Sequence, residues 1–404
     1  MKINAAILWK QGEPLSVEEA QLEAPHAGEV LVEVKAAGVC RSDLHPARGD
    51  WPARTPLVLG HEGAGIVREV GEGVTRVHLG DQVVFCWAPP CGVCSPCREG
   101  RPVLCDRLER TTYRNRLPAG GTRLRAREQD LAHFNGTACF ADFAVVAEEG
   151  AIRVPADVPF DALATIGCAV VTGVGAVMNA ACVKPGARVV VIGAGGVGLN
   201  VVQGAVLAGC EKIIAVDTQK KALDFACEFG ATNALEASPE NVERAVRQLT
   251  DGRGADYIFD TVGAPETLAQ ALAFARKGGT VVLTGLSRIE ALGSIPIFPF
   301  VVQEKRLIGS FYGSGLVADD VPRLIALYQA GKLKLRELVT RTYGLEDVND
   351  ALAALSSGAG GRGIILSVPP AQAGATDSPA HEPPAHAGGT DINKTLPRRS
   401  CRSA

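Results

Sequence analysis

The chain has 404 residues, of which 47% are hydrophobic and 21% charged, and it carries a formal net charge of −3 at pH 7. This length is enough for two ordinary domains with a sizeable core, and the composition is that of a globular protein. A slightly acidic balance gives no reason to expect nucleic acid or an anionic membrane as a partner.

The amino terminus lacks the long apolar run of a signal peptide, because charged residues stand within its first ten positions. We also expect no uncharged apolar segment that approaches the roughly 20 residues of a membrane helix. The protein is therefore expected in the cytoplasm, with no membrane partner. In that reducing compartment the 12 cysteines should be metal ligands or buried thiols rather than disulfides.

Residues 1–150 are expected to form an irregular all-β domain, because short apolar runs such as Glu29–Val34 alternate with glycine and proline. Within this domain Cys40 and His61 are two candidate ligands of one zinc ion, since Zn²⁺ favours thiolate and imidazole. The pair is weak evidence alone, because free cysteines are often simply buried. The polar, arginine-rich stretch from Asp106 to Ala138 is interpreted as a long surface loop that could edge a substrate cleft.

A second group of cysteines has the spacing of a closed zinc site. Three cysteines follow one another at intervals of three residues, and a fourth stands shortly after them. Short spacers let the backbone wrap one ion, whereas cysteines this close pair poorly as disulfides. Four protein ligands leave no open position, so we predict a structural zinc without a chemical role, held by Cys91, Cys94, Cys97 and Cys105.

The second half of the chain contains a dinucleotide-binding pattern: a buried strand at Val189–Ile192, a glycine-rich turn, a helical run, and a strand that ends on Asp217. In that context the glycines allow a tight turn, close approach of the backbone to a pyrophosphate, and close packing of helix on strand. The acid would bond the ribose hydroxyls of NAD and repel the 2′-phosphate of NADP. The predicted NAD contacts are Gly193, Gly195, Gly196, Val197, Gly198 and Asp217.

Further strand candidates extend the pattern to a doubly wound parallel sheet, with helical stretches such as Ala264 to Arg276 between them. From Pro369 onward the composition changes to proline, alanine, glycine and threonine, which have too little apolar content to fold. We expect residues 370–404 to be a disordered tail. The strand candidates are Ala255–Phe259, Thr280–Leu283 and Arg306–Gly309.

At this point the chain resembles the zinc-containing, medium-chain alcohol dehydrogenase family, over about residues 1–368. The resemblance implies an α/β protein in which a Rossmann coenzyme domain with a doubly wound parallel sheet interrupts a GroES-like, β-rich catalytic domain. Mapped on this chain, the catalytic domain would be residues 1–169, with 311–369 returning to it, and the coenzyme domain 170–310. The motifs that carry the resemblance are Gly60–Gly65 through Gly71, the four-cysteine group, Gly167-Cys168 and the Gly193–Gly198 turn.

The resemblance also implies the catalytic residues. Cys168 would complete the zinc ligands Cys40 and His61, as in the Cys₂His set known for alcohol dehydrogenase, and leave one open position. The zinc would act as a Lewis acid on the substrate oxygen, while the hydride goes to the nicotinamide. Ser42 would take the alcohol proton, which would pass through the nicotinamide ribose to His45.

Other residues would support this chemistry. Asp43 would orient the His61 ring, and Glu62 would lie behind the zinc and ligate it transiently. Ser42 and Asp43 could instead cap a helix, and His45 could be an exposed loop residue. The resemblance further places Arg41 and Arg362 at the coenzyme pyrophosphate and Thr172 at the nicotinamide, although both arginines could form surface ion pairs.

The stretch from Arg107 to Phe140 resembles the class III branch, which oxidises S-(hydroxymethyl)glutathione. Glu109, however, stands where that branch carries an arginine for the substrate carboxylate, and His45 stands where that branch often lacks a histidine. We therefore expect a primary or aromatic alcohol, with a thiol–formaldehyde adduct such as S-(hydroxymethyl)glutathione as the alternative. The chain should carry two zinc ions and form a homo-oligomer, dimer or tetramer.

Two other classes remain open on the same fold. Zinc-independent quinone or enoyl reductases lack the zinc ligands, so the Cys40, His61 and Cys168 set argues against that reading. The second class is a non-catalytic NAD(H)-binding protein, in which the zinc ligands and the proton relay would have no catalytic role.

Overall fold

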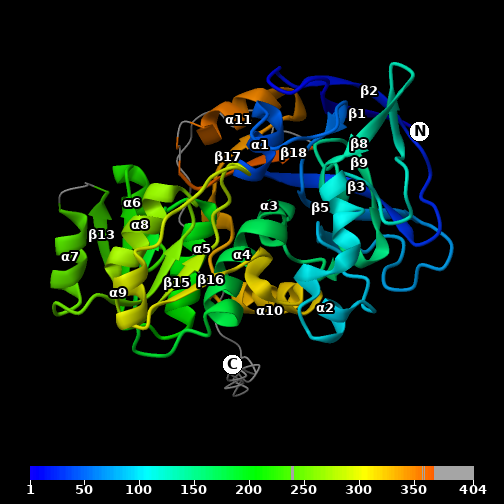
Figure 1. Cartoon of the computed structure of the whole chain (residues 1–404). Coiled ribbons are helices and arrows are strands. Elements are labelled where there is room, and N and C mark those ends of the chain that lie inside the picture. Colours follow the sequence, from blue (N-terminus) through cyan, green and yellow to red (C-terminus); the bar gives the residue numbers. More distant parts are fainter. Residues whose placement is uncertain (238–240, 357, 359, 368–404) are drawn as a thin grey trace, which may run out of the picture.

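The computed structural model describes residues 1–237, 241–356, 358 and 360–367, so the predicted tail at 370–404 lies outside the described residues. The chain forms two parts side by side, one built on a parallel sheet and the other on antiparallel strands (Figure 1). The structure is mixed α/β, with a doubly wound parallel sheet in one part and a β-rich arrangement in the other, as the sequence predicts.

The parallel sheet has six strands in the order β13-β12-β11-β14-β15-β16, and every neighbouring pair is parallel. The strand numbers decrease from β13 to β11 and then increase from β14 to β16, so the sheet is doubly wound. Ligands of such sheets bind at the carboxyl ends of the strands, near the point where the strand order reverses. The strands are β11 (Arg188–Ile192), β12 (Lys212–Asp217), β13 (Asn233–Glu236), β14 (Ala255–Asp260), β15 (Ala275–Leu283) and β16 (Arg306–Gly309).

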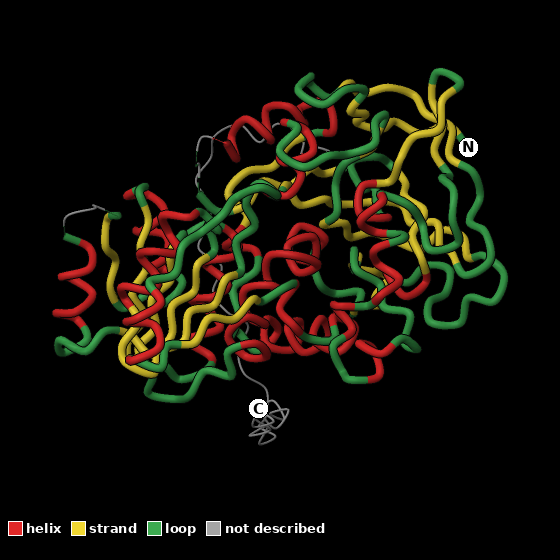
Figure 2. The backbone as a smooth tube through the Cα atoms, in the orientation of Figure 1, coloured by secondary structure: helices red, strands yellow, loops and turns green. Residues whose placement is uncertain are grey.

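Helices join and cover these strands (Figure 2). The longest of them follows β11 directly and begins within the glycine turn, which is the connection that a parallel pair needs. The helices are α5 (Gly196–Leu207), α6 (Lys220–Glu228), α7 (Val242–Leu249), α8 (Pro265–Phe274) and α9 (Ile297–Val302). The helical stretch predicted at Ala264 to Arg276 thus ends earlier, because β15 already begins at Ala275.

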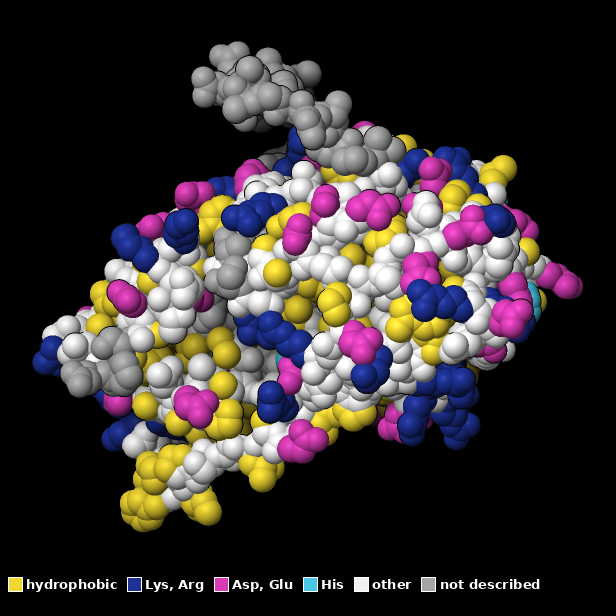
Figure 3. All heavy atoms as spheres, turned by 90° about the horizontal axis from the view of Figure 1, so that it is seen from above, with side chains coloured by type: hydrophobic (Ala, Val, Ile, Leu, Met, Phe, Trp, Pro, Cys, Tyr) yellow, Lys and Arg dark blue, Asp and Glu magenta, His cyan; other side chains and the backbone are white. Residues whose placement is uncertain are grey.

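Hydrophobic side chains gather on the surface around α9 (Figure 3, lower left). Half of the exposed large hydrophobic side chains in the described residues come from the seventeen positions 286–302, and Leu292 and Phe298 are 87% and 77% exposed. This segment immediately precedes β16, the edge strand of the six-stranded sheet. The set comprises Leu286, Ile289, Leu292, Ile295, Ile297, Phe298, Val301 and Val302, and we call it the α9 patch.

The other part contains a seven-stranded sheet in the order β10-β6-β5-β3-β18-β17, with β9 also paired to β3. Strand β18 pairs antiparallel with β3, so the last described strand returns to the sheet formed by the first 150 residues. The strands are β3 (Glu29–Val39), β5 (Glu62–Val70), β6 (Gln82–Phe85), β9 (Phe143–Ala147), β10 (Ala151–Val154), β17 (Val339–Tyr343) and β18 (Arg362–Leu366).

A small closed barrel of five strands lies beside this sheet. Two of its strands come from the stretch that we predicted as a surface loop, and that prediction was partly wrong. Leu124 and Leu131 are buried in the barrel, so the stretch alternates buried and exposed residues between its many arginines. The strands are β1 (Lys2–Leu8), β2 (Ser16–Leu22), β4 (Leu57–Val58), β7 (Leu124–Ala126) and β8 (Gln129–His133).

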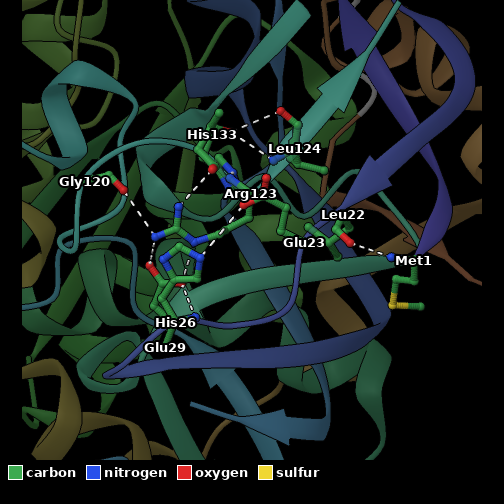
Figure 4. Close-up of polar contacts among 10 residues, drawn as sticks. Met1, Leu22, Glu23, His26, Glu29, Gly120, Arg123, Leu124 and His133 are labelled. Carbon is green, nitrogen blue, oxygen red and sulfur yellow. Dashed lines mark hydrogen bonds and ion pairs between the residues drawn. The ribbon is translucent and has the colours of Figure 1, made fainter. Parts of the chain in front are cut away.

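A buried ion pair fixes this former loop to the sheet (Figure 4). The Arg123 guanidinium donates two hydrogen bonds to the Glu29 carboxylate, over 2.8 and 2.9 Å, and both side chains are almost fully buried. The backbone N–H of Arg123 donates to Nε2 of His133 on β8, over 3.1 Å. The polar residues of the stretch therefore act inside the protein as well as on its surface.

Residues 1–150 are not all-β, because helices α1 (Arg41–Arg48) and α2 (Ser95–Arg98) interrupt the strands. The remaining helices are α3 (Phe160–Thr165), α4 (Val171–Gly175), α10 (Val317–Gln329) and α11 (Val348–Ser356). Short 3₁₀ turns also occur, three of them around the former loop at Asp106–Glu109, Thr112–Arg114 and Phe134–Gly136.

Segments α3 and α4 belong to one continuous helix, Phe160–Ala180, which contains two π-helical turns. Its 21 residues and mean hydropathy of 1.8 would suffice to cross a membrane, so the expectation that no such segment exists was wrong. Within this helix, 89% of the most apolar 18-residue window is buried inside the protein, as in a core helix. It lies in the largest buried cluster, which reaches from Val84 on β6 to Val191 on β11 and so joins the two parts.

Candidate functional site

Four metal-binding side chains meet beside the long helix. Cys40 stands between β3 and α1, His61 and Glu62 stand at the start of β5, and Cys168 lies in the first π-helical turn, Ile166–Val170. Their ligand atoms all lie within 4.8 Å of one another, and all four residues are buried. Such π-turns interrupt helices mostly at functional sites. The structure thus brings together the three ligands that the resemblance implied, although Cys168 lies more than 100 residues from the other two in sequence.

Asp43 holds two members of this cluster in place. Its Oδ1 lies 2.9 Å from Nδ1 of His61, and its Oδ2 accepts the backbone N–H of Cys40 over 2.9 Å. The first contact leaves Nε2 of the imidazole as the atom available to a metal. Burial lowers the pKa of His61, but the charge and hydrogen bond of Asp43 outweigh it and raise that pKa well above its usual value. Asp43 therefore both caps α1 and orients the ring.

The two thiols of the cluster shift each other's pKa in opposite directions. A hydrogen bond from Cys168 lowers the pKa of Cys40 well below its usual value, and the same contact raises the pKa of Cys168 well above it. Two thiolates this close repel each other in a buried site unless a cation lies between them. The donor set therefore fits a divalent metal, which needs both sulfurs deprotonated.

Glu62 connects this cluster to Arg362. The Glu62 Oε1 lies 2.7 Å from an Arg362 guanidinium nitrogen, and both side chains are buried. The second oxygen, Oε2, is buried without a hydrogen-bond partner among the described residues, and one carboxylate oxygen of Glu62 belongs to the metal-binding cluster. Burial raises the pKa of Glu62 to about 8, although the Arg362 charge opposes that shift. An unpartnered carboxylate oxygen is one more atom that a metal ion could satisfy.

The four cysteines of the second group also converge. Their sulfur atoms lie within 4.8 Å of one another on the segment that contains α2. The backbone N–H of Cys91 donates to Cys105 Sγ over 3.2 Å, and that of Cys94 donates to Cys91 Sγ over 3.4 Å. Hydrogen bonds from the Val93 and Cys94 backbone lower the pKa of Cys91 to about 6. This geometry fits a closed, four-sulfur metal site.

A cavity of about 570 Å³ opens at the carboxyl ends of β11 and β12. It is lined by the glycine turn, by Asp217, and by the two arginines that the resemblance placed at the coenzyme, Arg41 and Arg362. Cys40 lines it as well, so the metal-binding cluster adjoins the cavity. Thr172 and Gly198 are not among the lining residues, and the placement of Thr172 at a nicotinamide stays a prediction.

The glycine turn has the shape that phosphate binding needs. Gly193 has a φ of +90°, and a Cβ on Gly198 would lie 1.8 Å from the Gly193 carbonyl oxygen, so a side chain at position 198 would break the turn. A Cβ on Gly195 would meet nothing within 4 Å, which leaves room for a ligand. Asp217 accepts the backbone N–H of Ala194 over 2.7 Å, so this acid also holds the turn.

The predicted relay residues lie on one helix. Ser42 and His45 are three residues apart on α1, a spacing that places both on the same helix face. His45 is not an exposed loop residue, because its side chain is only 13% exposed. Its ring stacks on Trp51 with 4.3 Å between centroids, and Asp50 Oδ2 lies 3.3 Å from its Nδ1.

A second cavity, of about 390 Å³, reveals residues that sequence reasoning missed. It lies between the four-cysteine segment, which supplies Val103 and Leu104, and the carboxyl ends of β15 and β16. Thr284 and Ser310 line it, and their buried hydroxyl groups have no partner among the described residues. Both residues directly follow predicted strands, so their position at a strand end was the signal that could have identified them.

Comparisons with known proteins agree with this geometry. Residues 26–156 match the alcohol dehydrogenase GroES-like domain, and residues 196–330 match a family described as zinc-binding dehydrogenase. The NDMA-dependent alcohol dehydrogenase of Amycolatopsis methanolica is 39% identical over 374 residues, which cover 91% of this chain and 99% of that protein.

Two further proteins are similar over most of their length. S-(hydroxymethyl)glutathione dehydrogenase of Paracoccus denitrificans is 36% identical over 378 residues, covering 91% of this chain and 100% of that protein. The crystal structure of benzyl alcohol dehydrogenase from Acinetobacter calcoaceticus matches with a TM-score of 0.86 at 31% identity, covering 91% of this chain and 99% of that one.

Proposed function

Because this chain belongs to the zinc-containing, medium-chain alcohol dehydrogenase family, we propose that it is a zinc- and NAD-dependent enzyme that oxidises a primary or aromatic alcohol reversibly to its aldehyde. The observation that carries this proposal is the position of Cys40, which belongs to the buried metal-binding cluster and also lines the cavity at the glycine turn. A metal-bound alcohol and a nicotinamide coenzyme would therefore meet at the same place.

Cys40, His61 and Cys168 would hold a zinc ion that supplies Lewis-acid catalysis, and the cavity would hold NAD as the hydride acceptor. Asp43 keeps the His61 ring in its ligating orientation. Glu62 contributes one carboxylate oxygen to the cluster, from which it could support the ion. Cys91, Cys94, Cys97 and Cys105 would hold a second, structural zinc.

Other residues of the chain would bind the coenzyme and transfer the proton. Arg41 and Arg362 line the coenzyme cavity, where guanidinium groups can bind the oxygens of a pyrophosphate. Asp217 stands at the end of β12, where a carboxylate favours a free ribose hydroxyl over a phosphate. Ser42 would accept the proton of the alcohol, and His45 on the same helix face would carry it toward solvent.

The second cavity supports an alcohol with an apolar body. Its lining combines Val103, Leu104, Leu286 and Phe311 with only a few polar groups. Phe311 also contacts Trp87 edge to face, with 5.5 Å between centroids, and Trp87 in turn contacts His61 at 6.1 Å. Aromatic side chains therefore extend from the metal-binding cluster to the cleft, an environment that suits an aromatic ring.

The decisive experiment measures NAD⁺ reduction with a series of aliphatic and aromatic alcohols, with and without formaldehyde plus glutathione. We expect turnover with primary or aromatic alcohols alone, and two zinc ions per chain by elemental analysis. Turnover only with the thiol adduct would contradict the proposed alcohol substrate. It would favour S-(hydroxymethyl)glutathione, the substrate in the name of the Paracoccus relative. One zinc ion or none would contradict the zinc-dependent mechanism.

The Amycolatopsis relative gives a reason to test a second electron acceptor. Its name states dependence on NDMA, so the same alcohols should be offered with NDMA and no added NAD⁺. Turnover under that condition alone would contradict the proposal that free NAD⁺ is the co-substrate. A protein that binds NADH but oxidises no alcohol under either condition would belong to the non-catalytic class.

A further inference from the structure

Trp51 contacts both parts of the molecule at once. Its indole ring stacks on His45 of α1, with 4.3 Å between centroids and 18° between planes. Its Nε1–H donates to the backbone carbonyl of Ser287 over 2.9 Å. Ser287 belongs to the segment that follows β15 in the six-stranded sheet. One side chain therefore joins the histidine of the proposed relay to the part that carries the glycine turn.

Asp50 makes a second link between the same two segments. One of its oxygens lies 3.3 Å from His45 Nδ1, and the other lies 3.1 Å from Nε of Arg288. Arg288 is 73% exposed, so this ion pair contributes little by itself. The half-buried hydrogen bond of Trp51 is therefore the stronger of the two links.

The turn that carries Trp51 is held firmly on its own side. The side-chain amide of Gln11 donates to the carbonyl groups of Pro46 and Trp51, both over 2.8 Å. The glutamine stands between β1 and β2 of the barrel, so the turn is tied to the antiparallel part. Trp51 is thereby fixed to the antiparallel part, and its hydrogen bond to Ser287 crosses to the other part.

The segment around Ser287 is in turn connected to the cavities. Thr284, Gly285 and Leu286 line the 390 Å³ cavity. A Cβ on Gly285 would lie 2.5 Å from the backbone nitrogen of Gly263, so the segment packs on the one that follows β14. Val262 in that neighbouring segment lines the 570 Å³ cavity. The position of Ser287 therefore depends on the structure around both cavities.

We propose that Trp51 and Asp50 are positioning residues that couple His45 to segment 284–288. The relay histidine keeps its orientation only while that segment is docked on Trp51, so proton transfer depends on the contact between the two parts at this point. This inference rests on the proposed function, because it takes His45 as the relay residue. It adds two residues and one segment that the sequence did not single out.

The first test replaces Trp51 by phenylalanine, which keeps a ring that can stack on His45 but removes the N–H that reaches Ser287. We expect hydrogen exchange of the backbone amides at 284–288 to become about fivefold faster, as for the loss of one hydrogen bond. The kcat for alcohol oxidation should fall by a similar factor, while the KM for alcohol changes less than twofold. Trp9→Phe is the matched control, because it also removes an indole hydrogen bond, to Glu18, away from both cavities.

The second test removes the ion pair with Arg288→Gln, a surface change that should not affect folding. We expect exchange at 284–288 to become faster and kcat to fall, each by a smaller factor than in Trp51→Phe. In the double variant with Trp51→Phe, the combined effect should be smaller than the product of the two single effects. Arg244→Gln on α7 is the control for the lost charge.

Unchanged exchange at 284–288 in Trp51→Phe would overturn the coupling, even with a lower kcat. Faster exchange with an unchanged kcat would reduce Trp51 to a structural residue and would also overturn the proposal. If the wild-type protein oxidises no alcohol, the proposed function fails separately. The exchange comparison on the coenzyme-free protein then still decides whether Trp51 holds the segment.

Discussion

At the scale of single residues, Asp217 allows the most direct test of the coenzyme. Its carboxylate stands at the end of β12 and accepts the N–H groups of Ala194 and Gln219, over 2.7 and 2.9 Å. Asp217→Asn keeps an oxygen acceptor for the turn but removes the charge that would repel a 2′-phosphate. We expect the ratio of kcat/KM for NAD⁺ to that for NADP⁺ to fall at least tenfold.

The matched control for this prediction is Asp224→Asn, which removes an exposed acid of α6 that is paired with Lys220. It should leave the coenzyme ratio unchanged. An unaltered ratio in Asp217→Asn would mean that this carboxylate only supports the glycine turn.

Asp43 provides a prediction about metal retention. Its carboxylate contacts the His61 ring over 2.9 Å in a fully buried site, and residues that orient a ligating histidine typically change metal affinity 10- to 100-fold. We expect Asp43→Asn to lose one zinc ion per chain during dialysis against a chelator while the four-cysteine site keeps its own. Zinc analysis before and after dialysis measures this directly.

Two outcomes would contradict that expectation. Retention of both ions would show that the Asp43 contact is not needed to hold the metal. Loss of both ions would indicate general unfolding, which a circular dichroism spectrum of the dialysed protein would detect. Cys139→Ser offers a comparison, because this buried thiol lies near the cluster without belonging to it.

The site residues differ in how well they could be predicted from the sequence. The four close cysteines and the glycine turn follow from short spacings, because neighbouring residues in sequence are forced to be neighbours in space. Cys168 could not be found that way, since 107 residues separate it from His61 and only the resemblance pointed to it. Trp51 had no local signal at all, because its role arises only when the two parts meet, whereas Thr284 could have been noticed only from its position at the end of a predicted strand.

At the scale of elements, the strands of the parallel sheet were the most predictable. Buried parallel strands are continuous apolar runs, and β11, Arg188–Ile192, was predicted within one residue of its bounds. The edge strand β16 was predicted with its observed bounds, Arg306–Gly309. Strands β7 and β8 were missed because exposed arginines such as Arg125 alternate with the few buried leucines. A short strand in a small barrel leaves too few apolar positions to be distinguished from a polar loop.

Strand β8 carries a pH-sensitive residue, His133. Burial, with the nearby Arg123 charge as the second cause, lowers the pKa of His133 to about 3. Its Nε2 accepts the Arg123 N–H, and its Nδ1 has no partner among the described residues. Between about pH 6.5 and 3 the unfolded chain binds a proton at this histidine that the folded chain does not bind, so acid favours unfolding.

We therefore expect the folded state to lose about 1.4 kcal/mol per pH unit from this one group as the pH falls below 6.5. His133→Gln should remove that contribution, so its free energy of unfolding in urea should decrease less steeply between pH 6.5 and 5. His78→Gln, at a histidine that is 76% exposed, is the control and should keep the wild-type slope. Equal slopes in all three proteins would contradict the prediction.

At the scale of the whole molecule, the two parts are joined by a shared core and by a returning strand. The long helix Phe160–Ala180 lies in the cluster that reaches both sheets, and β18 completes the sheet of the first part with Arg362 as its first residue. Arg362 consequently pairs with Glu62 of the metal-binding cluster while it lines the 570 Å³ cavity. Such a residue cannot be assigned from local sequence, because its position depends on the path of the entire chain.

The α9 patch leads to a prediction about assembly. Eight large hydrophobic side chains are exposed there, beside an edge strand whose outer backbone groups are unpaired within the described chain. An apolar patch of this kind marks an interaction site, and an open sheet edge can pair with the same edge of a second copy. We therefore expect the homo-oligomer to form through the α9 patch and β16, with a two-fold axis between the copies.

Phe298→Asp tests this expectation, because Phe298 is 77% exposed in the single chain and would be buried between two copies. Burying one phenylalanine contributes about 1.5–3 kcal/mol, so losing it from both copies should weaken association at least a hundredfold. Light scattering and sedimentation at micromolar concentration should show a smaller species than the wild type. Leu79→Asp, at a residue that is 72% exposed in the other part, should leave the mass unchanged. A wild-type monomer, or a Phe298→Asp variant of unchanged mass, would show that this surface does not join the subunits.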